Sequence, residues 1–286
     1  MNFRQLAAPR LLGGKSLDLP TILLAAARLG YAARGFVYIG LGTIALLAAL
    51  DLTPRAKGAR GVLETWAAWP LGSLLIGVVA AGLIGFAVWR GVQAVFDADR
   101  HGTSIRGWAV RAGQAISGLV YGGLALSALE LLDVLEDVGE ADEEQGARQT
   151  ARLILDAPHG DTLLIAAGLI VVAFAIGNVV QGLAQDFGKR LACDERICRG
   201  VVPLAKAGYV ARGAATLPLG GFLILAGIEA RAGEARSWGR ALEVVEQQPF
   251  GSLVLAAMAA GLIAFGLFGF VEATFRRIRP PEALTN

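Results

Sequence analysis

One two-part pattern occurs three times along the chain, and this repeat constrains the fold more than any other feature. A basic residue followed two positions later by glycine opens an apolar segment at Arg28–Gly30, Arg111–Gly113 and Lys206–Gly208. A Pro-x-Gly turn opens a second apolar segment at Pro70–Gly72, Pro158–Gly160 and Pro249–Gly251. Because repeats of this length are whole structural units, each one predicts two apolar helices joined by a polar loop.

The apolar segments are long enough to cross a bilayer, which takes roughly 20 helical residues. They lie near 30–50, 72–95, 113–132, 162–184, 208–229 and 252–275. Only 17% of the 286 residues are charged, whereas soluble domains carry about 25%. The sequence therefore predicts an all-α integral membrane bundle of six transmembrane helices, built from three two-helix repeats with approximate threefold symmetry.

The charged residues predict how the chain is oriented in the membrane. Five loops join the six predicted helices. The two terminal segments and the second and fourth loops, together with the helix ends beside them, hold 18 of the 26 Lys and Arg residues. The positive-inside rule then places both termini in the cytoplasm of a bacterial cell, with the chain in the inner membrane. The acidic loop 130–144 falls outside, where it is either a solvated linker or a site for a divalent cation.

The expected segments follow from these boundaries. They are a cytoplasmic N-terminal segment (1–23), repeats 1, 2 and 3 (24–100, 107–186 and 202–278), and a cytoplasmic tail (279–286).

Polar side chains recur at fixed positions within the predicted helices. In the first helix of repeats 1 and 3, Tyr31 precedes Arg34 and Tyr209 precedes Arg212 by three residues, which places each pair on one helix face. The middle repeat has Ser117 at the position of the arginines.

The second helix of each repeat carries a carboxamide or a carboxylate near its end, at Gln93, Gln181 and Glu272. Gln93 and Glu272 follow Gly72 and Gly251 by 21 residues, which is roughly 30 Å along a helix. They are therefore expected at the depth of the arginines. The candidate polar inner layer is Arg34, Arg212, Tyr31, Tyr209, Gln93, Gln181 and Glu272.

Several of these residues have two interpretations. Arg34 and Arg212 either fix the helix register through hydrogen bonds or contact an anion or a lipid headgroup. Glu272 either pairs with Arg276, four residues later, or takes part in proton coupling. Cys193 and Cys198 are expected to be two reduced thiols, because a zinc site would need two further ligands.

The motifs in these helices resemble one bacterial family. They are the openings Arg28-Leu-Gly-Tyr31 and Lys206-Ala-Gly-Tyr209, the Tyr-x-x-Arg-Gly segments Tyr31–Gly35 and Tyr209–Gly213, and the turn Gln248–Gly251. Three such two-helix units are similar to the family catalogued as domain of unknown function 1206. The resemblance covers about residues 24–278 and implies an integral inner-membrane protein with three paired-helix repeats. It implies no activity.

The sequence contains no Walker loop, dinucleotide-binding glycine pattern, nucleophile elbow or His-Glu-x-x-His motif. No basic face favours nucleic-acid binding. We therefore expect no enzyme activity and no catalytic, cofactor-binding or metal-binding residues. The expected partners are the lipid bilayer, with anionic lipid headgroups or membrane proteins as further candidates.

Two functional classes remain open. One is a structural or assembly protein that interacts with lipids or membrane partners. The alternative is a small-solute or ion transporter or channel with a path along the threefold axis, as in some transporters built from repeats. Pro218 is a candidate hinge for transport, whereas an axis filled by Phe86, Phe174 and Phe265 would favour the first class.

Overall fold

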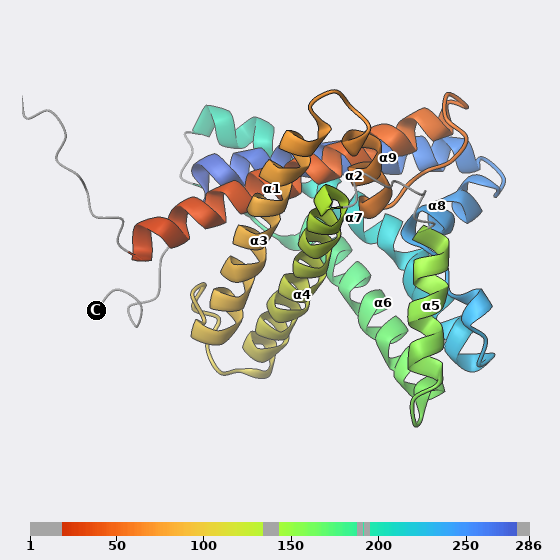
Figure 1. The fold of residues 1–286 in the computed structure, drawn as a ribbon. Coiled ribbons are helices and arrows are strands. Elements are labelled where there is room, and N and C mark those ends of the chain that lie inside the picture. Colours follow the sequence, from red (N-terminus) through yellow and green to blue (C-terminus); the bar gives the residue numbers. More distant parts are fainter. Residues whose placement is uncertain (1–18, 134–142, 188–190, 192–194, 279–286) are drawn as a thin grey trace, which may run out of the picture.

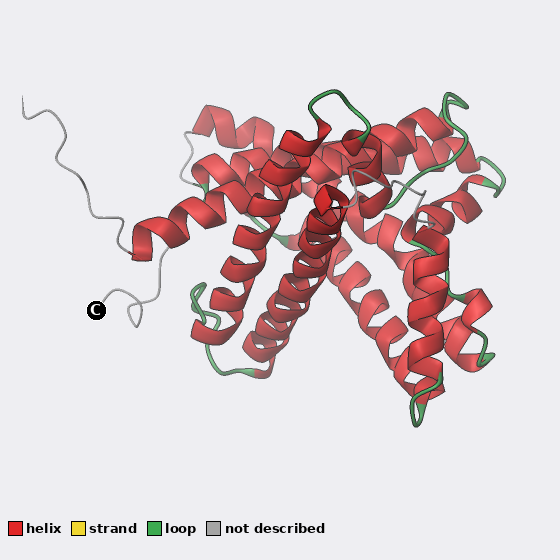
Figure 2. Ribbon diagram, viewed as in Figure 1, coloured by secondary structure: helices red, strands yellow, loops and turns green. Residues whose placement is uncertain are grey.

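Six long helices dominate the computed structural model, which describes residues 19–133, 143–187, 191 and 195–278 (Figures 1 and 2). They are α1 (Leu19–Ala49), α3 (Gly72–Phe96), α4 (Ile105–Asp133), α6 (Gly160–Ala184), α7 (Glu195–Ile228) and α9 (Gly251–Phe275). Each is long and apolar enough to cross a membrane. The predicted all-α membrane bundle with six spans is confirmed, although α1, α4 and α7 begin two to four turns before the predicted spans.

One short helix precedes the second long helix of each repeat. These short helices are α2 (Ala59–Ala67), α5 (Glu143–Leu155) and α8 (Trp238–Glu246), with the 3₁₀ turn η2 (Ala232–Glu234) before α8. The glycine of each Pro-x-Gly turn is the first residue of the following long helix. A Cβ atom at Gly72, Gly160 or Gly251 would collide with carbonyl oxygens at the end of the preceding short helix. Glycine is therefore required at these turns.

The long helices form three closely packed pairs, α1 with α9, α3 with α4, and α6 with α7 (Figure 1). Each pair joins the first helix of one repeat to the second helix of another. Equivalent small residues make the contact. A Cβ atom at Gly35 would lie 2.6 Å from the oxygen of Gly266, one at Gly213 would lie 2.5 Å from that of Ala175, and one at Gly118 would lie 3.3 Å from that of Ala87. Small residues allow this close backbone approach in membrane helices.

The repeated basic residues cap the ends of helices in these pairs. Arg28 Nη1 donates to the carbonyl oxygens of Ala273 and Thr274, at 2.7 and 2.6 Å, in the last turn of α9. Arg111 does the same for α3, donating from Nε to Ala94 and from Nη2 to Val95, at 2.7 and 2.9 Å. A cation at the carbonyl end of a helix satisfies free acceptors and opposes the helix dipole. This contact explains the basic residue in the first two repeats.

In the basic-x-Gly motif, the glycine forms a second kind of junction, which joins the two long helices of one repeat. A Cβ atom at Gly30 would lie 2.6 Å from the backbone of Phe86 on α3, and one at Gly208 would lie 2.6 Å from the backbone of Phe265 on α9. The equivalent Gly113 on α4 has no neighbour within 4 Å. Over their described residues, α4 and α6 do not pack along their lengths, and they diverge in Figure 1. Five of six junctions of a ring are formed, and the sixth is open.

Two isoleucines explain the open junction. In the closed junctions, Ala33 packs on Gly82 and Ala211 packs on Gly261. At the equivalent positions α4 has Ile116 and α6 has Ile170, which are 40% and 50% exposed. Two branched side chains cannot approach as an alanine and a glycine do, so the helices are held apart. Below, "the open junction" means the α4–α6 gap bordered by Gly113, Ile116, Ile170 and Phe174.

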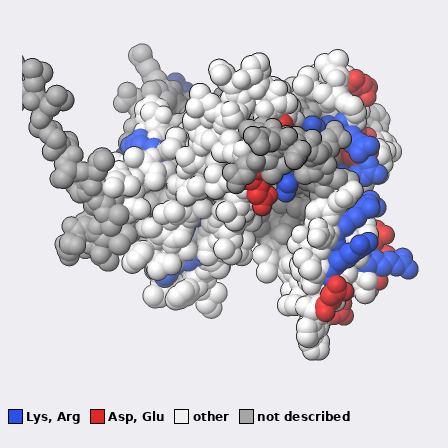
Figure 3. Space-filling view, viewed as in Figure 1, with Lys and Arg blue, Asp and Glu red and all other residues white. Residues whose placement is uncertain are grey.

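The surface agrees with a membrane location. Figure 3 shows a broad face over α3 and α4 that is almost free of charge, with Lys, Arg, Asp and Glu gathered near α5 and α8. Large apolar side chains such as Leu119 and Leu183 are exposed on α4 and α6. Exposed apolar area on this scale marks contact with lipid or with partners.

Candidate functional site

The first polar group in the bundle is a buried ion pair between α1 and α9. Arg34 Nη2 lies 2.5 Å from Glu272 Oε2, and both side chains are almost fully buried. Arg276, just past the end of α9, donates from Nη1 to Glu272 Oε1 at 2.6 Å. Glu272 therefore joins two guanidinium groups, which accounts for its charge inside an apolar bundle.

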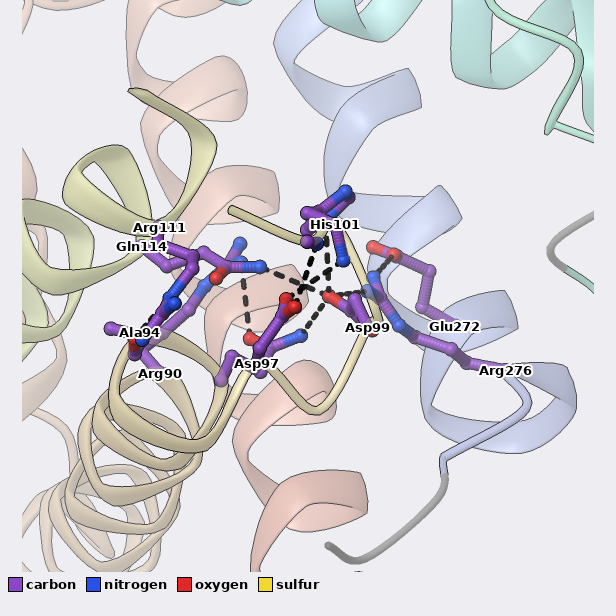
Figure 4. A network of polar contacts seen from close by, with 11 residues as sticks. Arg90, Ala94, Asp97, Asp99, His101, Arg111, Gln114, Glu272 and Arg276 are labelled. Carbon is purple, nitrogen blue, oxygen red and sulfur yellow. Dashed lines mark hydrogen bonds and ion pairs between the residues drawn. The ribbon is translucent and has the colours of Figure 1, made fainter. Parts of the chain in front are cut away.

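Asp99, in the loop between α3 and α4, extends this group to two more helices (Figure 4). Its Oδ2 atom accepts hydrogen bonds from Gln93 on α3 and Gln114 on α4, at 2.7 and 3.0 Å. The same atom lies 3.5 Å from Arg276 Nη2. Burial lowers the pKa of Arg276, but Tyr31, Glu272 and Asp99 outweigh it and raise that pKa above its ordinary value. We call Arg34, Gln93, Asp99, Gln114, Glu272 and Arg276 the inner polar network.

The loop that carries Asp99 is held in shape by Asp97. The backbone N–H groups of His101 and Gly102 donate to its carboxylate at 2.8 and 2.7 Å (Figure 4). Burial raises the pKa of Asp97, but these two hydrogen bonds outweigh it, so the pKa lies below its ordinary value. A carboxylate that accepts backbone N–H groups is favoured in its charged form.

This geometry predicts a pH-dependent effect of Asp97→Ala. Because the folded-state pKa is depressed, the stabilisation by Asp97 is present above the unfolded pKa of about 3.9 and is lost as pH falls through the lower folded value. Wild type should therefore unfold at a higher temperature than the variant at pH 6, and the gap should shrink toward pH 3. Asp156→Ala, at an exposed carboxylate beyond α5, is the control. A gap that is independent of pH would contradict the assignment.

A second polar group surrounds Arg212 on α7. Its Nε donates to the hydroxyl of Tyr38 on α1 at 2.8 Å, and its Nη1 donates to Asn178 Oδ1 on α6 at 3.2 Å. The Asn178 amide is fixed in turn by donating to the carbonyl oxygen of Phe174 at 2.7 Å. Arg212 is only 9% exposed. Its hydrogen-bond partners among the described residues are neutral, in contrast to those of Arg34.

Aromatic rings and the two arginines fill the centre of the ring of helices. The Arg34 guanidinium lies 5.2 Å from the centre of the Phe86 ring and 4.9 Å from that of Phe265. Arg212 lies 4.9 Å from both Phe265 and Phe174. The order is therefore Phe86, Arg34, Phe265, Arg212, Phe174, with a cation between successive rings. We call these five residues the central stack.

The predicted polar layer is divided between these groups. Arg34, Gln93 and Glu272 belong to the inner polar network, whereas Arg212 does not. Tyr31 is buried under Arg276, and Tyr209 packs edge-on against Phe265. Gln181 is partly buried on α6. The partner of Arg212 on α6 is instead Asn178, almost one turn earlier.

Sequence reasoning assigned no role to Asp99, Asn178 or Tyr38. Asn178 carries a signal, since it is one of few hydrogen-bonding side chains inside the apolar run 162–184. The signal for Asp99 is weaker. It is an acidic residue in a loop that is basic at its other end.

The expectation of two reduced thiols is wrong for Cys198, which is disulfide-bonded. The C-x4-C spacing had suggested only a metal site as an alternative to free thiols. Cys193 lies outside the described residues, as does most of the acidic loop 130–144. Of that loop, Glu144 is described, and it accepts a hydrogen bond from the backbone N–H of Ser237 at 2.8 Å.

Comparisons with known proteins place the chain in a family. A family model described as Domain of Unknown Function (DUF1206) matches residues 29–97, 112–185 and 207–276. The chain belongs to that family. The three matched segments coincide with the three repeats, so the DUF1206 unit is one two-helix repeat.

The chain is also similar to a protein from a bacterium. The uncharacterized protein YxxB of Bacillus subtilis (strain 168) is 31% identical over 255 residues, which cover 88% of this chain and 90% of the relative. No solved structure matches this DUF1206 chain.

Proposed function

We propose that this chain is a multi-pass inner-membrane protein that binds lipid or a membrane partner and has no enzymatic or solute-conducting activity. The observation that carries the proposal is the central stack. Three phenylalanines and two arginines occupy the middle of the ring, where a solute path would run. The ring is instead open at its side, between α4 and α6.

The orientation is part of this proposal. The distribution of Lys and Arg favours a cytoplasmic location for the end of the bundle that holds the inner polar network. The third turn of α1 and the last turn of α9 meet there, through the hydrogen bonds from Arg28 to Ala273 and Thr274. Both termini are then cytoplasmic, and α2, α5 and α8 lie toward the outer surface.

The inner polar network supports a structural role for its members. Its two carboxylates and two arginines are paired with each other and with two carboxamides, and the six residues come from the α3–α4 loop and from α1, α3, α4 and α9 or its end. Paired buried charges of this kind fix helix register.

One observation favours the transporter alternative. Helix α7 contains Pro203 and Pro218, and a proline removes a backbone hydrogen bond from the helix interior. The helix nevertheless continues from Glu195 to Ile228 through both prolines. Continuous helices are less typical of transport sites than broken ones.

An efflux measurement tests the proposal. Vesicles that contain the purified protein would be loaded with potassium chloride, and the release of each ion would be measured against protein-free vesicles. We expect equal rates. Release above the protein-free rate would favour the transporter alternative, and Phe265→Ala, which removes the middle ring of the central stack, should then increase it.

A further inference from the structure

Arg212 is one of two guanidinium groups in the core of the bundle that contact no carboxylate among the described residues. Of the buried or half-buried arginines near the centre, Arg34 and Arg276 contact carboxylates, whereas Arg212 contacts a phenol, a carboxamide and aromatic rings. Arg90 likewise has only Gln93 and the Phe86 ring as its described partners. Four guanidinium groups thus face two carboxylates, Asp99 and Glu272. An uncompensated cation in an apolar environment is costly, which favours a bound anion.

The open junction brings Arg212 close to the lipid. Phe174, on which its guanidinium is stacked, is the equivalent of Phe86 and Phe265. Those two rings are covered by the helices of Gly30 and Gly208 and are fully buried. Gly113, which would cover Phe174, meets nothing, and Phe174 remains partly exposed. Arg212 therefore lies at the inner edge of the one junction that the described residues leave open.

The depth of Arg212 matches a lipid headgroup. Asn178 lies six residues before the end of α6, or about 9 Å along its axis. A helix of 25 residues such as α6 is about 37 Å long, which exceeds the roughly 30 Å of hydrocarbon by several ångströms at each end. Asn178 and its partner Arg212 then lie a few ångströms below the headgroup level, within the reach of an arginine side chain.

We propose that the open junction binds an anionic phospholipid, with its phosphate on Arg212 and an acyl chain against Ile116, Ile170 and Phe174. The Nη2 group of Arg212, which makes no hydrogen bond to the described residues, is the donor that faces the phosphate. Asn178 and Tyr38 are positioning residues, because they hold the other two nitrogens. This inference rests on the proposed function and names the ligand class.

The test measures lipid binding by the full-length protein, purified in detergent and freed of lipid. Phosphatidylglycerol, phosphatidylcholine or inorganic phosphate would be added in turn, with thermal unfolding and native mass spectrometry as readouts. We expect phosphatidylglycerol alone to bind and to raise the unfolding temperature. Arg212→Gln should weaken this binding at least about tenfold, since charge-assisted hydrogen bonds to phosphate are strong.

A second pair of variants leaves Arg212 intact, in case its replacement prevents folding. Gly113→Trp places a large side chain in the open junction, where nothing lies within 4 Å, and should abolish phosphatidylglycerol binding. Gly123→Trp is the matched control, because Gly123 lies on the same helix and also has no neighbour within 4 Å. It should bind phosphatidylglycerol as wild type does.

Three outcomes would overturn the inference. They are equal phosphatidylglycerol binding by wild type and Gly113→Trp, equal binding of phosphatidylcholine, and equal stabilisation by inorganic phosphate, which would make a free anion the ligand. The efflux measurement keeps the two proposals separate. Ion release would refute the proposed function whatever the lipid result, and loss of lipid selectivity without ion release would refute only this inference.

Discussion

Replacing Glu272 with alanine is expected to remove a large part of the stability of the protein. Glu272 accepts hydrogen bonds from Arg34 and Arg276, at 2.5 and 2.6 Å, and the variant would leave Arg34 buried without a counter-charge. Breaking a buried ion pair by removing one partner costs about 3–5 kcal/mol. Folded proteins have about 5–15 kcal/mol in total. The unfolding temperature in detergent should therefore fall sharply, and less folded protein should be recovered.

The matched control is Glu229→Ala. Glu229 also pairs with an arginine, Arg231, at 3.3 Å, but both side chains are exposed. Exposed pairs contribute about 0–1 kcal/mol, so this variant should unfold like wild type.

A double variant separates charge from packing. If the cost of Glu272→Ala is the unpaired charge of Arg34, then Arg34→Met/Glu272→Met should be more stable than either single methionine variant, because apolar side chains replace both charges at once. Additive losses would instead mean that Arg34 is held mainly by the rings of Phe86 and Phe265. Unchanged stability of Glu272→Ala would contradict the inner polar network as a whole.

The fold was largely predictable from the sequence because the repeat is regular. Six apolar runs, the Pro-x-Gly turns and the basic-x-Gly openings predict the helices and their order. Arg34, Gln93 and Glu272 lie at a common depth in the bundle, as their positions along the helices predict. Depth alone does not determine which helices are neighbours. The closely packed pairs α1–α9, α3–α4 and α6–α7 each join two different repeats.

The open junction was not predicted, although its cause is visible in the sequence. The middle repeat has Ile170 at the position of Gly82 and Gly261, and the repeat pattern alone does not show the consequence of this difference. Its meaning depends on the fact that Gly82 packs on Ala33, whose equivalent on α4 is Ile116. A contact between helices far apart in sequence had to be known before the substitution could be interpreted. The partner of Arg212 was missed for a related reason. The middle repeat has Gln181 where α9 has Glu272, so no acid among the described residues meets Arg212, and Asn178 is its partner on α6.

The same substitution at three equivalent glycines should have different effects at closed and open junctions. A Cβ atom at Gly30 or Gly208 would lie 2.6 Å from the backbone of a facing phenylalanine, so Gly30→Ala and Gly208→Ala require the helices to move apart. Overpacking of this kind costs about 1–3 kcal/mol. The Cβ atom that Gly113→Ala adds contacts no other residue. This variant should stabilise α4, since alanine is favoured over glycine in a helix by about 1 kcal/mol. Thermal unfolding of the three purified variants measures the difference.

This comparison also tests whether the ring is open in the membrane. The three glycines share a sequence context, so any general effect of alanine on helix stability is common to all three variants. A loss at Gly30 and Gly208 with a gain at Gly113 is expected if α4 and α6 remain apart in a bilayer. Equal losses at all three positions would mean that α4 closes on Phe174 there. A closed ring would seal Arg212 from lipid, and its charge would then have to be balanced from within the protein.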